Sequence, residues 1–284
     1  MPRATTSDWS QEVDDLARGL GGGMLFGIPL VYTMEVWWLG GTTRAPHMLA
    51  ALLVTFVPIA LLIHTAGFRR DEDTRPSDAL MDAVEAVALG VVAAGLLLLV
   101  LGEIGPGTPL AETTGKLVYE GVPFAIGVAV ARHILGGSRT ADDDGSSTAR
   151  TPGQATLADL GATLVGAVFV AFNIAPTDEI PMLASSATFP SLLSVVVLSV
   201  AASYVIVFVA GFGDQPSRRG QEGLFQHPMT ETVSAYLVAL LSAAAMLWFF
   251  QRIEGPVLSA ATFTQVLLLG LPAAVGGAAG RLAV

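Results

Sequence analysis

The chain has 284 residues, of which 52% are hydrophobic and only 13% are charged. Soluble globular domains carry roughly 25% charged residues, so this composition excludes an ordinary soluble protein. The apolar residues recur along the whole chain in blocks of about 18–22, the length at which a helix crosses a bilayer. No polar stretch is long enough to fold as a separate enzymatic domain. The chain is therefore predicted to be an all-α, polytopic membrane helix bundle.

The formal net charge is −10, and the only lysine is Lys116. We interpret this acidity as a halophile signature rather than a sign of cationic partners, because charges are strongly screened in a high-salt cytoplasm. The sequence contains no Cys, which excludes disulfides and thiolate chemistry. The segment 1–15 is polar and acidic, unlike a signal peptide, so the first apolar block is expected to remain as a membrane helix.

A window of about 19 residues, suited to membrane helices, predicts eight spans. They are expected at Gly19–Leu39, Met48–Ala66, Ala83–Gly102, Leu117–Leu135, Leu157–Ala175, Leu192–Phe212, Thr232–Phe250 and Phe263–Gly280. Most connections between them are short. The segment 136–155 is polar and rich in Gly and Ser, which predicts a flexible linker.

The basic residues predict the orientation of these spans, because Arg and Lys near span ends resist translocation. With eight spans both termini share one side, and that side collects eleven basic residues against three on the other. Trp37, Trp38 and Trp248 lie at span ends predicted to be outside, where aromatic rings favour the interface. The sequence therefore predicts a multi-pass protein of the cell membrane with both termini in the cytoplasm.

An internal repeat relates the two halves of the chain. Early in each half the displacement is 144 residues, as between Asp15 and Asp159. Later it is 149 residues, and the matches are Asp82 with Glu231, Ile104 with Ile253, the segment 121–127 with 270–276, and Arg132 with Arg281. Chance similarity between Gly-, Ala- and Leu-rich helices is the alternative. Against it, the matches fall in order and include charged residues at span boundaries.

The repeat predicts two four-span units, 1–135 and 156–284, joined by the cytoplasmic linker 136–155. Because four is an even number, both units would cross the bilayer in the same direction. The pseudo-two-fold axis that relates them would then run along the membrane normal. The predicted architecture is thus eight transmembrane helices arranged as two parallel four-helix repeats.

Three segments carry a resemblance to a known family: RGLGGGMLFGIPLVYTMEVWWLG from Arg18, PTDEIPMLA from Pro176 and LPAAVGGAAGRLAV from Leu271. Together they make the chain similar to an uncharacterised family of prokaryotic multi-spanning integral membrane proteins, over about Leu16 to Val284. The resemblance implies a multi-spanning architecture. It carries over no catalytic or binding residue, because the family has no assigned activity.

Small residues and prolines predict where the spans pack closely or bend. Glycines four residues apart let helix backbones approach each other, and prolines inside a span delete a backbone hydrogen bond. The residues concerned are Gly19, Gly23 and Gly27 in the first span, Gly276 and Gly280 in the last, and the repeat-related Pro123 and Pro272. The two prolines indicate either kinked packing or a broken helix that lines a path.

Acidic residues within spans are the best functional candidates, because a carboxylate costs roughly 2.5–3.5 kcal/mol to insert at the bilayer centre. Glu35 and its counterpart Glu179, preceded by Asp178, are expected near the outer ends of spans one and five, with Glu120 at a similar depth. They could converge on a cation or proton entrance. Alternatively, Glu35 is solvated at the interface and Glu120 pairs with Lys116 at i,i+4 spacing.

A second acidic group is expected at the cytoplasmic side. Asp82 and Glu85 begin span three, and Glu231 begins span seven. Acids in a first helical turn are stabilised by the helix dipole, with Ser77 and Thr230 as candidate caps. If they do not serve as helix-start residues, these acids would form the inner mouth of a pathway.

We therefore expect a transporter or channel for a small cation or proton, with its pathway between the two repeats. One alternative is a non-transporting scaffold whose Gly-rich faces bind a membrane-protein partner or a second copy. Another is a membrane-embedded enzyme acting on a lipid or isoprenoid. The catalytic and metal-site motifs that we searched for are absent, which disfavours an enzyme. No cofactor is predicted, the metal content stays open, and the basic residues are too dispersed for nucleic-acid binding.

Overall fold

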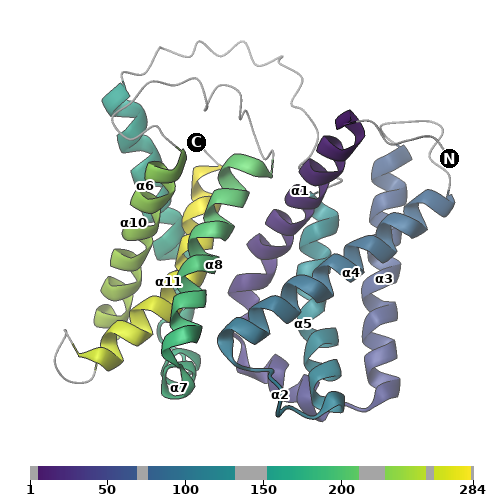
Figure 1. The fold of residues 1–284 in the computed structure, drawn as a ribbon, viewed down its shortest axis with the longest axis horizontal. Coiled ribbons are helices and arrows are strands. Elements are labelled where there is room, and N and C mark those ends of the chain that lie inside the picture. The colour runs from purple at the N-terminus through teal and green to yellow at the C-terminus, as the bar shows by residue number, and fades with distance from the viewer. Residues whose placement is uncertain (1–5, 69–75, 132–151, 211–227, 254–258, 283–284) are drawn as a thin grey trace. The chain divides into compact units, whose positions relative to one another are not determined.

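The computed structural model describes residues 6–68, 76–131, 152–210, 228–253 and 259–282, and every regular element in them is a helix (Figure 1). The helices are α1 (Thr6–Val31), α2 (Met34–Thr42), α3 (Ala45–Phe68), α4 (Pro76–Leu101), α5 (Leu110–Val130), α6 (Pro152–Ile174), α7 (Glu179–Ser186), α8 (Phe189–Tyr204), the π-helical turn η2 (Val205–Val209), α10 (Pro228–Phe249) and α11 (Ala260–Arg281). The predicted linker residues 136–151 lie outside the described residues, and α6 already begins at Pro152.

The chain divides into two compact units. Unit 1 comprises Met1–Leu99, Glu103–Gly137 and Val209–Gly211, and unit 2 comprises Val100–Gly102, Ser138–Phe208 and Phe212–Val284. Helices α1 to α5 therefore belong to unit 1. Almost all of α6 to α11 belongs to unit 2, and each unit is described by itself.

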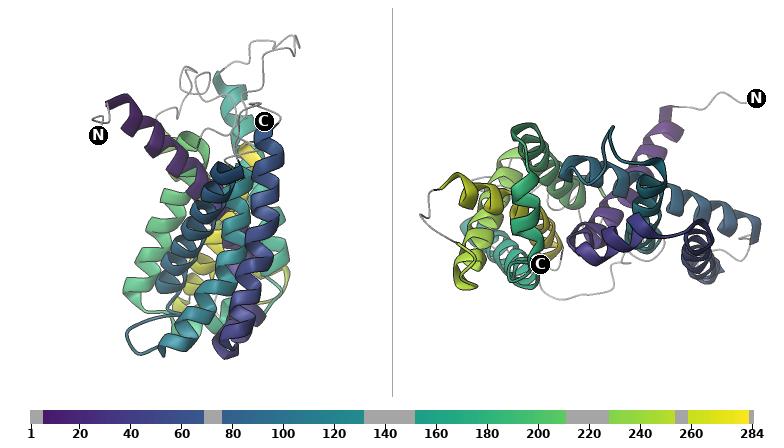
Figure 2. Two further views of the ribbon diagram at one scale, coloured as in Figure 1. Left: turned by 90° about the vertical axis from the view of Figure 1, so that its right-hand side faces the viewer. Right: turned by 90° about the horizontal axis from the view of Figure 1, so that it is seen from below.

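In unit 1, α5 packs against α1, α2 and α3, and Figure 2 shows α3 and α5 side by side. Helices α1 and α5 are in close contact, because a Cβ added at Gly22 would lie 2.5 Å from the carbonyl oxygen of Gly127. Gly23 and Gly27 also face α5, the second of them against the ring of Phe124. Backbones can approach this closely only where both helices present small residues.

Unit 2 has a corresponding central helix, α11, which contacts α6, α7, α8 and α10. Its closest contact is with α6, where a Cβ added at Gly276 would lie 2.5 Å from the carbonyl oxygen of Gly166. Gly280 faces Ala162 one turn further along. Pro123 in α5 and Pro272 in α11 both lie inside continuous helices, so the structure does not support a broken helix at either proline.

The chain bends sharply within the first predicted span and again just after the fifth. Between α1 and α2 the chain turns by 90°, and between α6 and α7 by 87°. The predicted span Gly19–Leu39 therefore has a wrong end, because α1 stops at Val31, whereas the predicted end of Leu157–Ala175 agrees with the end of α6 at Ile174 to within one residue. Pro176 follows the end of α6, where its missing N–H and its ring disfavour continuation of the helix.

Five helices are long and apolar enough to cross a membrane, namely those containing Ala45–His64, Ser77–Leu101, Phe189–Val209, Pro228–Phe249 and Ala260–Arg281. Counting each bent pair as one span raises the number to seven among the described residues. The helix α5, expected as the fourth span, is not one of these, because Lys116 and Glu120 interrupt its apolar sequence. The protein is thus a helical bundle with five to seven candidate membrane spans.

Candidate functional site

Glu120 is the most deeply buried acid in the described part of the chain. Its exposed fraction is 0%, and neither of its carboxylate oxygens has a hydrogen-bond partner. The residue lies in the middle of α5, one turn before Phe124, which packs on the α1 glycines. Burying a neutral polar group without a hydrogen-bond partner costs up to several kcal/mol, depending on its surroundings. Burying an unpaired charged group costs more. The burial of the Glu120 carboxyl therefore has a free-energy cost that no hydrogen bond offsets.

Lys116 lies one turn before Glu120 on α5 and is held in an ion cluster at one end of unit 1. Its Nζ is 2.9 Å from an Oε of Glu112 and 3.3 Å from an Oε of Glu103. The same Nζ donates a hydrogen bond of 2.9 Å to the carbonyl oxygen of Glu103. The expected Lys116–Glu120 pair is therefore wrong. A Glu four residues before a Lys is the more favourable order in a helix.

The three acidic and basic residues of α5 form a line, which we call the α5 stripe: Glu112, Lys116 and Glu120. They are four residues apart, so they lie on one face of the helix and extend over about 12 Å at 1.5 Å per residue. Side-chain exposure falls along the stripe, from 35% at Glu112 to 9% at Lys116 and to a fully buried residue at Glu120. The stripe connects the surface of unit 1 with its interior.

Helix α2 covers the start of α5 and the ion cluster. A Cβ at Gly40 would lie 2.9 Å from the carbonyl oxygen of Gly115, so α2 and α5 are in backbone contact. Trp37 is fully buried, and its Nε1 donates a hydrogen bond of 2.6 Å to the carbonyl oxygen of Val31. That carbonyl is one of those left without a helical partner where α1 ends. The indole thus stabilises the bend and closes this end of unit 1.

The structure places the predicted outer acids at the starts of the two short helices. Glu35 lies in the first turn of α2 and is exposed, whereas Glu179 lies in the first turn of α7 and is buried. Asp178 precedes α7 and pairs with Arg252, with 2.9 Å between Oδ1 and Nη1. Glu35 and Glu179 belong to different units, and both occupy positions where the helix dipole favours a negative charge.

The predicted inner acids are also separated between the units. Asp82 and Glu85 are partly buried on α4 of unit 1, while Glu231 pairs with the guanidinium of Arg281 in unit 2. The expected caps Ser77 and Thr230 are wrong, because α4 begins at Pro76 and α10 at Pro228, which places both residues inside a helix. Proline is favoured at a first helical position, where its missing N–H has no partner to lose.

Five residues that form these contacts were not expected from the sequence to do so: Glu103, Glu112, Trp37, Arg252 and Arg281. Glu112 could have been found, because it completes the i,i+4 spacing of the α5 stripe. Glu103 contacts Lys116 across a loop, and Arg252 contacts Asp178 over 74 positions. No local pattern encodes such contacts.

Comparison with known proteins places this architecture in one family. A family model described as "Putative integral membrane protein (DUF2391)" matches residues 15–284. No curated protein and no solved structure matches the chain. The match covers both units and the whole α5 stripe, and so this chain, a helical bundle with several membrane spans, belongs to the DUF2391 family of integral membrane proteins.

Proposed function

We propose that this protein moves protons across the membrane and that Glu120 is the group that binds them. The observation that supports this function best is the complete burial of a carboxyl group whose two oxygens have no partner. Ionisable residues inside membrane helices are costly and are typically found on ion or proton pathways. Among the predicted acids, Glu120 replaces the pair Glu35 and Glu179 as the centre of the proposal.

A proton suits this place better than a metal cation. One carboxyl oxygen is enough to hold a proton, whereas hard cations such as Ca²⁺ take six to eight oxygen ligands. The α5 stripe leads from the surface toward Glu120, because Glu112 and Lys116 lie on the same helix face and each can exchange a proton, although no hydrogen bond joins Lys116 to Glu120. The Glu112–Lys116 distance of 2.9 Å is short enough for direct transfer between the two side chains.

The proposal includes the duplicated architecture of two four-span repeats with eight membrane helices and both termini in the cytoplasm. Three structural features of the first half recur in the second half, at the displacements of 144 and 149 residues, and support this duplication. The bends of 90° and 87° correspond. The contact of Gly22 with Gly127 corresponds to that of Gly166 with Gly276. The contact of Gly121 with Val91 likewise corresponds to that of Gly270 with Leu240.

The duplication also provides an internal comparison for Glu120. Its equivalent in α11 is Leu269, which is fully buried in the core of unit 2. The fold therefore accommodates an apolar side chain at this position, so the carboxyl of Glu120 is not needed to build the helix bundle. A proton-binding role that is confined to unit 1 would explain why unit 1 has Glu120 where unit 2 has Leu269.

The test is proton flux into vesicles that contain the purified full-length chain. The wild type should carry protons down an imposed gradient, and Glu120→Leu should reduce the flux to that of protein-free vesicles. Because Leu removes an unpartnered buried carboxyl, the same variant should unfold at a higher temperature than the wild type. Loss of activity with a gain of stability is the signature of a functional group rather than a structural one.

Glu35→Leu is the matched control, because Glu35 is an exposed acid in unit 1 and lies outside the α5 stripe. Its flux should equal that of the wild type. Wild-type flux that Glu120→Leu leaves unchanged would contradict the role of Glu120. A wild type that moves no protons under any gradient, although folded, would contradict the proposed function itself.

A further inference from the structure

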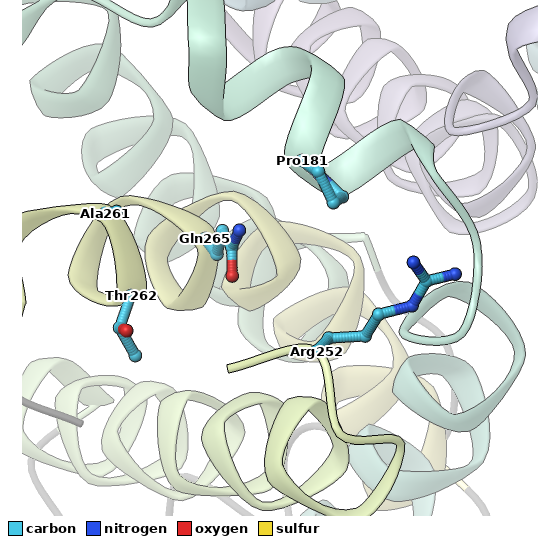
Figure 3. A pocket seen from close by; sticks show the side chains of 5 residues that line it. All are labelled: Pro181, Arg252, Ala261, Thr262 and Gln265. Atoms are coloured by element: carbon cyan, nitrogen blue, oxygen red, sulfur yellow. The ribbon is translucent and has the colours of Figure 1, made fainter. Parts of the chain in front are cut away.

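Unit 2 contains a pocket of about 220 Å³ at the junction of α7, the chain after α10 and the start of α11 (Figure 3). Its lining residues are Pro181, Arg252, Ala261, Thr262 and Gln265. None of these described lining residues is acidic. The volume is far larger than the roughly 10–15 Å³ that a single water molecule requires. The pocket can therefore accept a polar group of several heavy atoms.

The pocket occupies the place that the ion cluster fills in unit 1, if the duplication proposed above is applied residue by residue. The equivalents of its lining residues are Trp37, Glu103, Glu112, Thr113 and Lys116. In unit 1, Trp37 is fully buried and Lys116 bridges the two glutamates. In unit 2, proline replaces the large indole, and alanine and glutamine replace one glutamate and the lysine. The same position is thus filled in one unit and open in the other.

The charge of the site is also reversed between the units. Arg252 stands in place of Glu103, and Ala261 in place of Glu112, so two carboxylates are exchanged for one guanidinium. In the described part of the chain, the amide of Gln265 has no hydrogen-bond partner, and Figure 3 shows this side chain on α11, the helix that also carries Ala261 and Thr262. The open site therefore offers donors to a ligand that brings negative charge.

Arg252 is only loosely held by its acidic neighbour. Its Nη1 is 2.9 Å from Oδ1 of Asp178, but the Asp178 side chain is 78% exposed, and such pairs contribute little. Its Nη2 also donates to the carbonyl oxygen of Pro176, which fixes the guanidinium at the bend between α6 and α7. A ligand oxygen can replace Asp178 without loss of this backbone contact. Guanidinium groups bind phosphate oxygens through two parallel hydrogen bonds.

We propose that this pocket binds a phosphate group through Arg252 and Gln265. The group is either the headgroup of a phospholipid or a free phosphate ion, since both present the same oxygens. The proposal is independent of Glu120, which belongs to unit 1. The duplication serves only to explain why the position is open. The pocket and its hydrogen-bond donors are observed in unit 2 whether or not the two halves are repeats.

The experiment measures how phosphate compounds raise the unfolding temperature of the full-length chain in a phosphate-free detergent. Inorganic phosphate and a short-chain phosphatidylglycerol are titrated separately at constant ionic strength. Gln265→Glu should weaken the apparent affinity for the effective compound by roughly 10–100-fold, the range for loss of a charge-assisted hydrogen bond. This variant leaves the contact of Arg252 with Pro176 in place, whereas removal of Arg252 would also disturb the bend.

Gln251→Glu is the matched control, because it adds the same charge at an exposed residue outside the pocket lining. This variant should bind the effective phosphate compound with the same apparent affinity as the wild type. Stabilisation by phosphatidylglycerol alone identifies a lipid site, and stabilisation by inorganic phosphate at similar concentrations identifies a free-ion site. Either result, if weakened by Gln265→Glu and not by Gln251→Glu, supports the proposal. No stabilisation by either compound, or equal stabilisation of both variants, overturns it.

Discussion

Gly127→Ala is expected to destabilise unit 1 strongly although it adds only one methyl group. A Cβ at this position would lie 2.9 Å from the carbonyl carbon of Gly22 and 3.0 Å from the Cα of Gly23. These are backbone atoms, so the two helices must move apart and lose contacts along their whole crossing. Overpacking of this kind typically costs about 1–3 kcal/mol. Thermal unfolding in detergent measures the loss.

The contact between α6 and α11 in unit 2 allows the same test. Gly276→Ala should destabilise by a similar amount, because a Cβ there would lie 2.5 Å from both the Gly166 carbonyl oxygen and a Val170 methyl group. Gly161→Ala on α6 is the control: no atom lies within 4 Å of an added Cβ, and Ala is favoured over Gly in a helix by about 0.5–1 kcal/mol. If Gly127→Ala were as stable as Gly161→Ala, the close crossing of α1 and α5 would be refuted.

Glu231→Gln should be the most destabilising single change among the ion pairs. Arg281 is only 2% exposed, forms a salt bridge with Glu231, and lies with its Cζ 5.5 Å from the ring centre of Phe208. Removal of one partner of a buried ion pair costs about 3–5 kcal/mol. The double variant Glu231→Gln/Arg281→Met should recover most of this loss, because no buried charge then remains.

The exposed pair of Arg18 with Asp15 is the comparison for this prediction. Its atoms are 3.0 Å apart, but the side chains are 25% and 50% exposed. Asp15→Asn should therefore change stability by less than about 1 kcal/mol. An equal loss from Glu231→Gln and Asp15→Asn, measured by chemical or thermal unfolding, would show that burial does not set the strength of the Arg281 pair.

The composition and the apolar blocks were sufficient to predict an all-helical membrane protein, because the cost of exposing backbone groups to lipid leaves few other solutions. They did not reveal the two bends. The sequence from Gly19 to Leu39 is apolar on both sides of the break at 32–33, so a hydropathy window averages over it. The first bend is stabilised by a local hydrogen bond, from Trp37 to the carbonyl oxygen of Val31 six residues earlier, which a hydropathy average does not register.

The candidate site was predictable only in part, for a similar reason. Glu120 was visible as an acid within an apolar helix, and its cost in a membrane follows from its residue type alone. Whether Lys116 neutralises it depends on the loop before α5, which brings Glu103 to the lysine instead. The pairing of charges thus depended on a contact between residues 13 positions apart.

If Glu120 carries the proposed function, its carboxyl group takes up and releases a proton as the protein works. Infrared difference spectroscopy of the full-length chain in lipid, recorded as a proton gradient is imposed and reversed, observes carboxyl groups directly. In the wild type a carboxyl band should change reversibly with the gradient, and this band should be missing in Glu120→Gln. Identical difference spectra for the two proteins would contradict it.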